Sequence, residues 1–137
     1  MATVTLHRIA GTKKALEVCR LVESLYLAGK RVVVFVSDGA RASVLDEYLW
    51  TFSQPSFVPH VLWNGASEVE EPVVLVLGEL ANPNGADTLV VADHLADLTA
   101  ASAFAEVHEV LARVAEDEGK AEAWQAAGFT VAGPAGR

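Results

Sequence analysis

The first third of the chain has the hydrophobic pattern of strands that alternate with a helix. Hydrophobic and polar residues alternate over 3–8, which is typical of a half-buried β-strand. Hydrophobic residues then recur at three- and four-residue spacing over 15–26, and Gly29 follows as a helix stop. Residues 31–36 are a nearly continuous β-branched and aromatic run, typical of a strand covered on both faces in a parallel sheet.

The middle of the chain continues this alternation. Ser37 and Asp38 are suited to cap a second helix, which we expect over about 39–50. The segment NPNGAD at 82–87 predicts a turn, because its Asn, Pro and Gly residues favour turn geometry. Further strands are expected over 58–62, 73–77 and 88–92. At least five strands are therefore predicted, in a single-domain, Rossmann-like α/β fold with a mostly parallel sheet flanked by helices.

The last third is alanine-rich, and helix propensity alone would allow one long helix over 99–126. A helix of that length without a cap is unusual in so small a domain. We favour a strand over 106–111 and a helix over about 112–127 that ends at Gly128 and Phe129. This division depends mainly on the family resemblance described below.

Length and composition limit the class of protein. The 137 residues allow one domain, 1–137, and the longest apolar runs are about a quarter of the length that crosses a bilayer. The N-terminal segment lacks the order of a signal peptide, and the single cysteine, Cys19, suits a reducing compartment, so a cytoplasmic protein is expected. The net charge of −8 disfavours direct binding of duplex DNA.

A parallel α/β sheet raises the question of nucleotide binding, but no phosphate-binding motif is present. The first strand-to-helix connection, 9–14, has one glycine where a dinucleotide fingerprint needs three, and neither Gly-Lys pair is followed by Ser or Thr as in a Walker loop. The strand-end residues Asp38, Asp93 and His94 are the remaining candidates for a small enzyme, as an alternative interpretation. We expect no catalytic residue, metal or cofactor.

Aromatic residues gather in one part of the sequence. Five of the ten lie between positions 48 and 63, and they border a polar, proline-containing connection over 51–56. Large aromatic side chains beside a loop are typical anchors of protein interfaces. The alternative is that they belong to the core.

The segment LDEYLWTFSQPSFVPH, 45–60, closely resembles the corresponding segment of the chi subunit of bacterial DNA polymerase III. The family's Leu-Asp-Glu, Leu-Trp and Ser-Phe-Val-Pro-His occur here with the family's spacing. The similarity continues with GKRVVV at 29–34, ANPNGADTLVV at 81–91 and AAGF at 126–129, so it covers nearly the whole chain.

This resemblance implies a mononucleotide-binding-like fold without nucleotide binding and a role as an accessory subunit of the clamp-loader complex. The protein would not be an enzyme by itself but a subunit of a DNA-directed DNA polymerase, a nucleotidyltransferase holoenzyme. It would pair with a psi-like subunit or a repair helicase and contact the acidic tail of single-stranded DNA-binding protein. The partner-binding residues implied by position are Leu49, Trp50, Phe57, Val58, Pro59 and His60.

The chain departs from the family at the site for that acidic tail. Where the family offers Arg, Tyr and Lys, the matching positions hold Glu118, Ala121 and Glu122. Like charges would repel an acidic tail, so this contact is either absent or moved. Residues 1–41 contain seven basic and three acidic residues, whereas 42–137 contain three and fifteen. The replacement site is therefore expected in the basic first third, at Lys13, Lys14 and Arg20.

Overall fold

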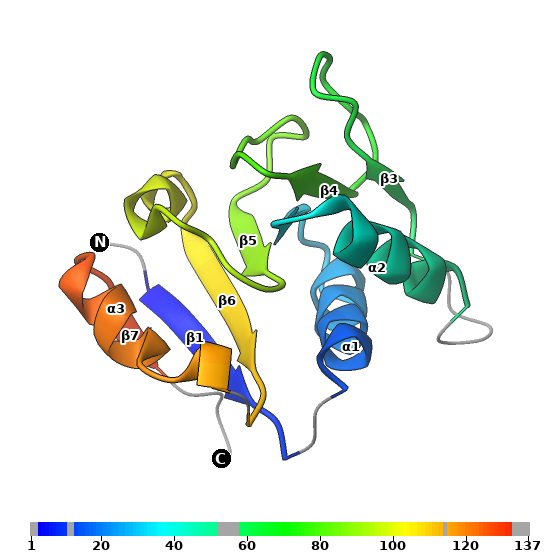
Figure 1. The fold of residues 1–137 in the computed structure, drawn as a ribbon. Coiled ribbons are helices and arrows are strands. Elements are labelled where there is room, and N and C mark those ends of the chain that lie inside the picture. The colour runs from blue at the N-terminus through cyan, green and yellow to red at the C-terminus, as the bar shows by residue number, and fades with distance from the viewer. Residues whose placement is uncertain (1–2, 11–12, 52–57, 114, 133–137) are drawn as a thin grey trace.

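The protein has one seven-stranded sheet in the computed structural model, which describes residues 3–10, 13–51, 58–113 and 115–132. The strands are β1 (Thr3–Arg8), β2 (Val32–Val36), β3 (His60–Leu62), β4 (Val73–Leu77), β5 (Thr88–Val91), β6 (Glu106–Leu111) and β7 (Thr130–Ala132). Their order is β3-β4-β2-β5-β6-β1-β7, and all neighbouring pairs are parallel (Figure 1). The predicted α/β fold is confirmed, with two more strands than the predicted minimum.

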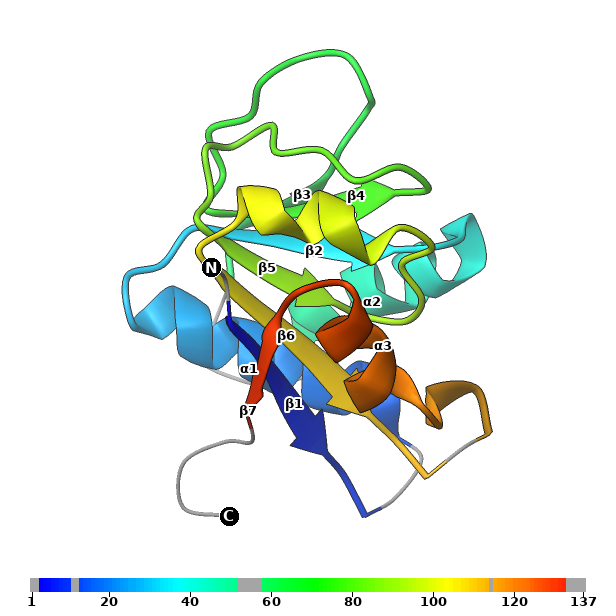
Figure 2. The same cartoon turned by 90° about the vertical axis from the view of Figure 1, so that its left-hand side faces the viewer.

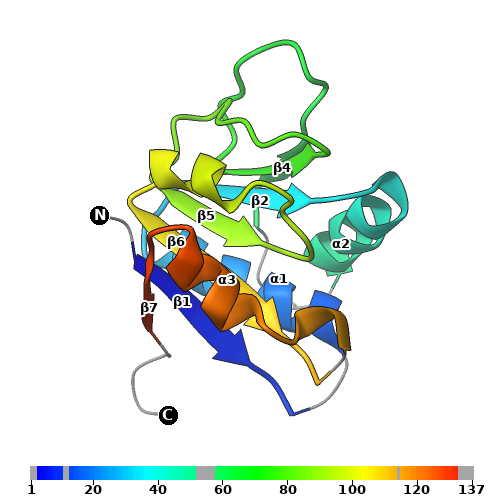
Figure 3. The ribbon, with the colours of Figure 1, turned by 60° about the vertical axis from the view of Figure 1, so that its left-hand side comes forward.

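Helices cover both faces of this sheet. The helices α1 (Lys14–Leu27) and α2 (Gly39–Thr51) lie on one face, and the 3-10 helix η1 (Leu98–Ala103) and α3 (Lys120–Ala126) lie on the other (Figures 2 and 3). Strand β2 divides its side chains between the two cores, because successive residues of a strand point to opposite faces. Val34 packs with the residues of α1 and α2, whereas Phe35 packs with Trp124 of α3. All five residues of β2 are buried, as the hydrophobic run predicted.

Helix α1 follows the predicted spacing. Its buried residues are Val18, Cys19, Val22 and Leu25. Burial raises the pKa of the Cys19 thiol to about 12, so the thiol stays protonated and serves the packing of the helix rather than nucleophilic chemistry.

The predicted helix over 112–127 is wrong in its first half. A short 3-10 turn, η2 (Ala115–Asp117), comes first, and Gly119 with φ of +76° precedes α3. The Asp117 carboxylate accepts a hydrogen bond from the amide of Ala112 at 2.7 Å, which brings the end of η2 back to the end of β6. A continuous helix would instead engage that amide in the helical ladder or leave it at a terminus. The α-helix therefore begins only after the left-handed Gly119.

Strand β7 was not predicted, and several other boundaries differ by one or two residues. Gly128, with φ of +97°, turns the chain after the end of α3. Residues 130–132 then pair with β1 at the edge of the sheet. Strand β3 begins at His60 rather than at Val58. The turn at 82–87 is confirmed, since Asn82 exchanges two hydrogen bonds with the backbone of Ala86. In the described part of the chain, no helix is long and apolar enough to cross a membrane.

Candidate protein-interaction site

Helix α2 is fixed firmly against the sheet, and this fixes the side chains at its carboxyl end. The Asp38 side chain accepts a hydrogen bond from the amide of Arg41 at 2.9 Å, as expected of a helix cap. The buried face of the helix, Ala42, Leu45 and Leu49, belongs to the core between α1, α2 and the sheet. A side chain on an exposed flank of this helix therefore has a defined place on the surface.

Trp50 is such a side chain. It is 52% exposed, and its ring lies 4.7 Å from that of His60, centroid to centroid, at an interplanar angle of 56°. The His60 ring is held from both nitrogens: Nδ1 lies 2.7 Å from the Val58 carbonyl oxygen and Nε2 lies 3.1 Å from Asp46 Oδ1. An exposed indole on a firmly held ring is a suitable anchor for a protein partner, because aromatic anchors lose little conformational entropy on binding.

The six residues predicted as partner contacts differ in exposure. Trp50 is exposed and Pro59 is half-buried, while Phe57 lies outside the described residues. The other three lie beneath the surface: Leu49 at 3% exposed, Val58 at 0% and His60 at 7%. The expectation of direct contact through these three is corrected by their packing, since hydrophobic burial draws Leu49 and Val58 into the core and hydrogen bonds draw in His60. They support the surface on which Trp50 lies.

A cleft of about 710 Å³ opens on the other side of α2, between this helix and α1 at the carboxyl ends of β2 and β5. Its apolar wall includes Val44 and Tyr48, which are 44% and 41% exposed. Basic side chains also line it: Lys13, which directly precedes α1, Lys14 of α1 and Arg41 of α2. The cleft therefore combines apolar surface with positive charge.

The three predicted tail-binding residues do not form one patch. Lys13 and Lys14 line the cleft, whereas Arg20 is not among its lining residues. The Lys14 ammonium is bound by both carboxylate oxygens of Asp117, at 2.9 and 3.0 Å, and the Arg20 guanidinium pairs with Glu17 at 2.9 Å. Of the three, Lys13 is the exposed cation for which no ion pair within the described chain is seen.

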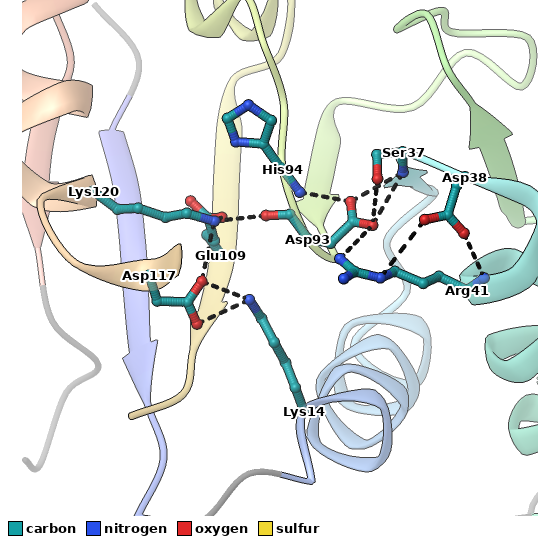
Figure 4. Close-up of polar contacts among 9 residues, drawn as sticks. All are labelled: Lys14, Ser37, Asp38, Arg41, Asp93, His94, Glu109, Asp117 and Lys120. Carbon is teal, nitrogen blue, oxygen red and sulfur yellow. Dashed lines mark hydrogen bonds and ion pairs between the residues drawn. The ribbon is translucent and has the colours of Figure 1, made fainter. Parts of the chain in front are cut away.

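Asp93 and His94 are the residues of the alternative enzyme interpretation, and the contacts of Asp93 are those of a structural residue (Figure 4). The Asp93 carboxylate accepts hydrogen bonds from the Ser37 amide at 3.0 Å, the Ser37 hydroxyl at 2.8 Å and the His94 amide at 2.6 Å, and it pairs with Arg41 at 3.3 Å. The His94 ring is exposed and points away from that carboxylate. The oxygens of this carboxylate are thus occupied by donors of the protein itself. Asp93 therefore links the ends of β2 and β5 to α2.

A nucleotide is accordingly expected to leave the stability of the protein unchanged. At millimolar ATP or NAD the melting temperature should not move, because a ligand stabilises only in proportion to its occupancy of the folded state. Differential scanning fluorimetry measures this, with buffer of matched ionic strength as the control. A rise of several degrees with either nucleotide would contradict the prediction and favour the enzyme interpretation.

A network of four charged side chains lies between α1, β6 and α3 (Figure 4). The Lys120 ammonium bonds to Glu109 Oε2 at 2.5 Å and pairs with Asp117 at 3.3 Å, and Lys14 holds Asp117 from the other side. Burial raises the pKa of Glu109. The charge and hydrogen bond of Lys120 and the hydrogen bond of Trp124 lower it, but burial has the larger effect. Burial opposes the charge on Lys120, but attraction from Glu109 and Asp117 outweighs it and raises the pKa of the ammonium. These residues tie the C-terminal segment to the sheet and leave no free group for binding.

Comparison with known proteins places the chain in a family. The model of the family described as "DNA polymerase III chi subunit, HolC" matches residues 1–129. The chain belongs to the DNA polymerase III chi subunit family. The resemblance of the segment 45–60 is thereby confirmed at the level of the family.

Individual chi relatives match over stretches of differing length. The chain is 41% identical to the DNA polymerase III subunit chi of Pseudomonas aeruginosa over 61 residues, which is 44% of this chain and 42% of the relative. It is 31% identical to the probable subunit chi of Rickettsia prowazekii over 74 residues, 54% of this chain and 44% of the relative. With the subunit chi of Escherichia coli it shares 29% identity over 119 residues, 83% of this chain and 80% of the relative. The first two matches span less than half the length of those relatives.

Within this chi-family chain, the C-terminal acidic residues lie at the surface. Glu118 and Glu122 are exposed and Ala121 is half-buried. Glu118 precedes α3, which begins at Lys120, so the three positions do not share one helix as the sequence suggested. Glu122 lies in the first turn of α3, where its charge is favourable to the helix dipole.

Sequence reasoning missed Asp46 as a part of the site. Asp46 belongs to the matched segment, but nothing in its type or spacing indicated that it would bond to His60, fourteen residues further on. The signal that could have found it is positional: Asp46 and Trp50 are four residues apart on one helix and therefore share a face. A residue next to an exposed tryptophan on that face is a candidate for its support.

Proposed function

We propose that this chi-family protein is a non-catalytic accessory subunit of the clamp-loader complex of DNA polymerase III. In this role it joins a psi-like subunit or a repair helicase to single-stranded DNA-binding protein during replication. The observation that carries the proposal is the 52% exposed Trp50 on a firmly held helix end, in the segment that most resembles the family. The family match over residues 1–129 supports the context of replication.

The geometry favours protein binding at Trp50 over an enzymatic role. Asp93, the strand-end carboxylate, is occupied by Ser37 and Arg41, and the network around Glu109 is occupied internally. Among the described residues, no group of three or more His, Cys, Asp or Glu side chains is placed to hold a metal ion. A large exposed aromatic side chain, by contrast, is the feature that dominates binding energy at protein interfaces.

Trp50→Ala is expected to abolish most of the binding to the psi-like or helicase partner. Loss of a central aromatic anchor costs about 2 kcal/mol or more of binding free energy, which is roughly a 30-fold rise in Kd. The partner is first captured from cell extract with the unaltered protein and identified by mass spectrometry. Its affinity for the variant is then measured by calorimetry with purified components. From its place in the sequence, Phe57→Ala is expected to act in the same direction.

Leu27→Ala is the matched control for this experiment. Leu27 is 69% exposed and ends α1, so its removal takes away a large exposed side chain outside the Trp50 surface. We expect this variant to bind like the unaltered protein. Equal affinity of Trp50→Ala and Leu27→Ala would contradict the proposed site, and capture of proteins unrelated to replication would contradict the proposed function.

The second proposed contact, with the acidic tail of single-stranded DNA-binding protein, is weak and relocated. Glu118 and Glu122 disfavour the family's usual place, and the exposed Lys13 beside the cleft is the best remaining cation. A peptide of that tail is expected to bind more weakly than to a chi protein with basic residues at those positions. Residual binding should fall steeply with salt, because exposed charges are screened beyond about 8–10 Å at physiological ionic strength.

The structure sharpens the variants that locate this contact. Lys13→Glu should abolish the residual binding of the tail peptide, measured by fluorescence anisotropy at low salt. Lys14→Glu would also break the ion pair with Asp117 and is therefore a poor test. Arg20→Glu reverses another exposed positive charge outside the cleft and is the control, because its solvent-exposed pair with Glu17 contributes little to stability. Unchanged affinity in Lys13→Glu would place the contact elsewhere.

A further inference from the structure

We propose that Asp46 and His60 are positioning residues that hold the Trp50 indole in the orientation in which a partner meets it. The proposal rests on the proposed function, because it concerns the same site. His60 does not reach the surface, since its side chain is fully covered, and yet its ring lies 4.7 Å from the indole. It therefore acts on a partner through Trp50.

The two polar partners of His60 fix the orientation of its ring. The Val58 carbonyl oxygen can only accept, so Nδ1, at 2.7 Å, carries a proton and donates it. On the other side of the ring, Nε2 lies 3.1 Å from Asp46 Oδ1, within hydrogen-bond distance. With partners on both sides, the plane of the ring is held in one orientation against the indole, 4.7 Å away between centroids.

The bond from Asp46 links two elements beneath the indole. Asp46 and Trp50 lie four residues apart on α2, whereas His60 begins β3. The carboxylate thus ties the ring of His60 to the same helix face that carries Trp50. Without it, the ring keeps the single bond to Val58 and can turn, and the indole loses a fixed support. Since Asp46 is 37% exposed and Leu45 and Leu49 anchor the helix independently, the fold does not depend on this bond.

The decisive variants are Asp46→Ala, which removes the bond, and Asp46→Asn, which keeps an oxygen that can accept from Nε2. Glu47→Ala removes the neighbouring, exposed carboxylate on the same helix and is the matched control. The indole N–H signal of Trp50 is assigned in ¹⁵N-labelled protein by comparison with Trp50→Phe, and its ¹H–¹⁵N NOE reports fast motion. We expect more indole motion in Asp46→Ala only, with urea midpoints unchanged in all three variants.

The binding measurement uses the purified partner that the unaltered protein captures. Asp46→Ala should raise its Kd roughly 2- to 12-fold, the loss expected when one large side chain must be immobilised on binding. Asp46→Asn and Glu47→Ala should bind normally. An indole equally ordered in Asp46→Ala, or equally mobile in Asp46→Asn and Asp46→Ala, overturns the proposal. So does unchanged Kd in Asp46→Ala where Trp50→Ala binds poorly.

Failure of the proposed function is distinguishable from failure of this inference. If Trp50→Ala itself binds the partner normally, the proposed site is wrong whatever Asp46→Ala does. The indole measurement requires no partner, so it tests the support of Trp50 by Asp46 and His60 in either case.

Discussion

Lys120→Met is expected to destabilise the protein by about 3–5 kcal/mol, because it leaves the buried Glu109 carboxylate without its cation and removes one of the two cations beside Asp117. The side chains of Glu109 and Asp117 are each 2% exposed, and Lys120 bonds to the first at 2.5 Å and pairs with the second at 3.3 Å. Methionine fills a similar volume, so the loss reports the charge rather than a cavity. The midpoint of urea unfolding, followed by circular dichroism, measures the effect.

Two further variants make this prediction specific. Lys30→Met removes an ion pair with Glu106 in which both side chains are more than a third exposed, and such surface pairs contribute about 0–1 kcal/mol. Adding Glu109→Gln to Lys120→Met removes the buried charge that was left unpaired, and should recover part of the loss. Equal midpoints for Lys120→Met and Lys30→Met would show that water reaches the network.

The network also shows why the end of the fold was harder to predict than its beginning. The strands and helices up to residue 51 follow from hydrophobic spacing, because each places a continuous apolar face against one core. The segment after β6 is governed by a few polar contacts instead. Asp117 bonds to Ala112 and to the distant Lys14, and no periodic pattern in the sequence records such a partner. Strand β7, three residues long, is too short to leave a period-two signal.

The candidate site was predictable only in part, for a similar reason. The clustering of aromatic residues indicated an interface near Trp50, and the resemblance to the chi family gave the surrounding segment. Neither could distinguish the exposed Trp50 from the buried Val58, eight residues further on, because both belong to one run of residues with no clear periodicity. Exposure is set by how α2 and the segment that leads into β3 pack against the core, and this packing is a property of the fold.

Trp124→Ala and Trp50→Ala are expected to differ sharply in stability, which tests whether Trp50 serves the core. Trp124 is fully buried, its indole donates to Glu109 at 2.9 Å, and its ring meets Phe129 edge-on at a centroid distance of 4.8 Å. Its truncation should cost about 3–5 kcal/mol, as for other buried tryptophans. Trp50→Ala should keep a near-normal urea midpoint, because more than half of the side chain already faces water.

The same two variants connect stability with binding. If Trp50 is a partner anchor, Trp50→Ala loses the partner while remaining folded, and the folded fraction of Trp124→Ala still binds it. Partner binding is measured on folded protein at low urea, so that instability does not imitate loss of affinity. A large drop in the midpoint of Trp50→Ala, with the partner still bound by the folded fraction, would assign this tryptophan to the core. The partner would then have to meet another surface, and the cleft lined by Val44 and Tyr48 on the same helix would be the next to test.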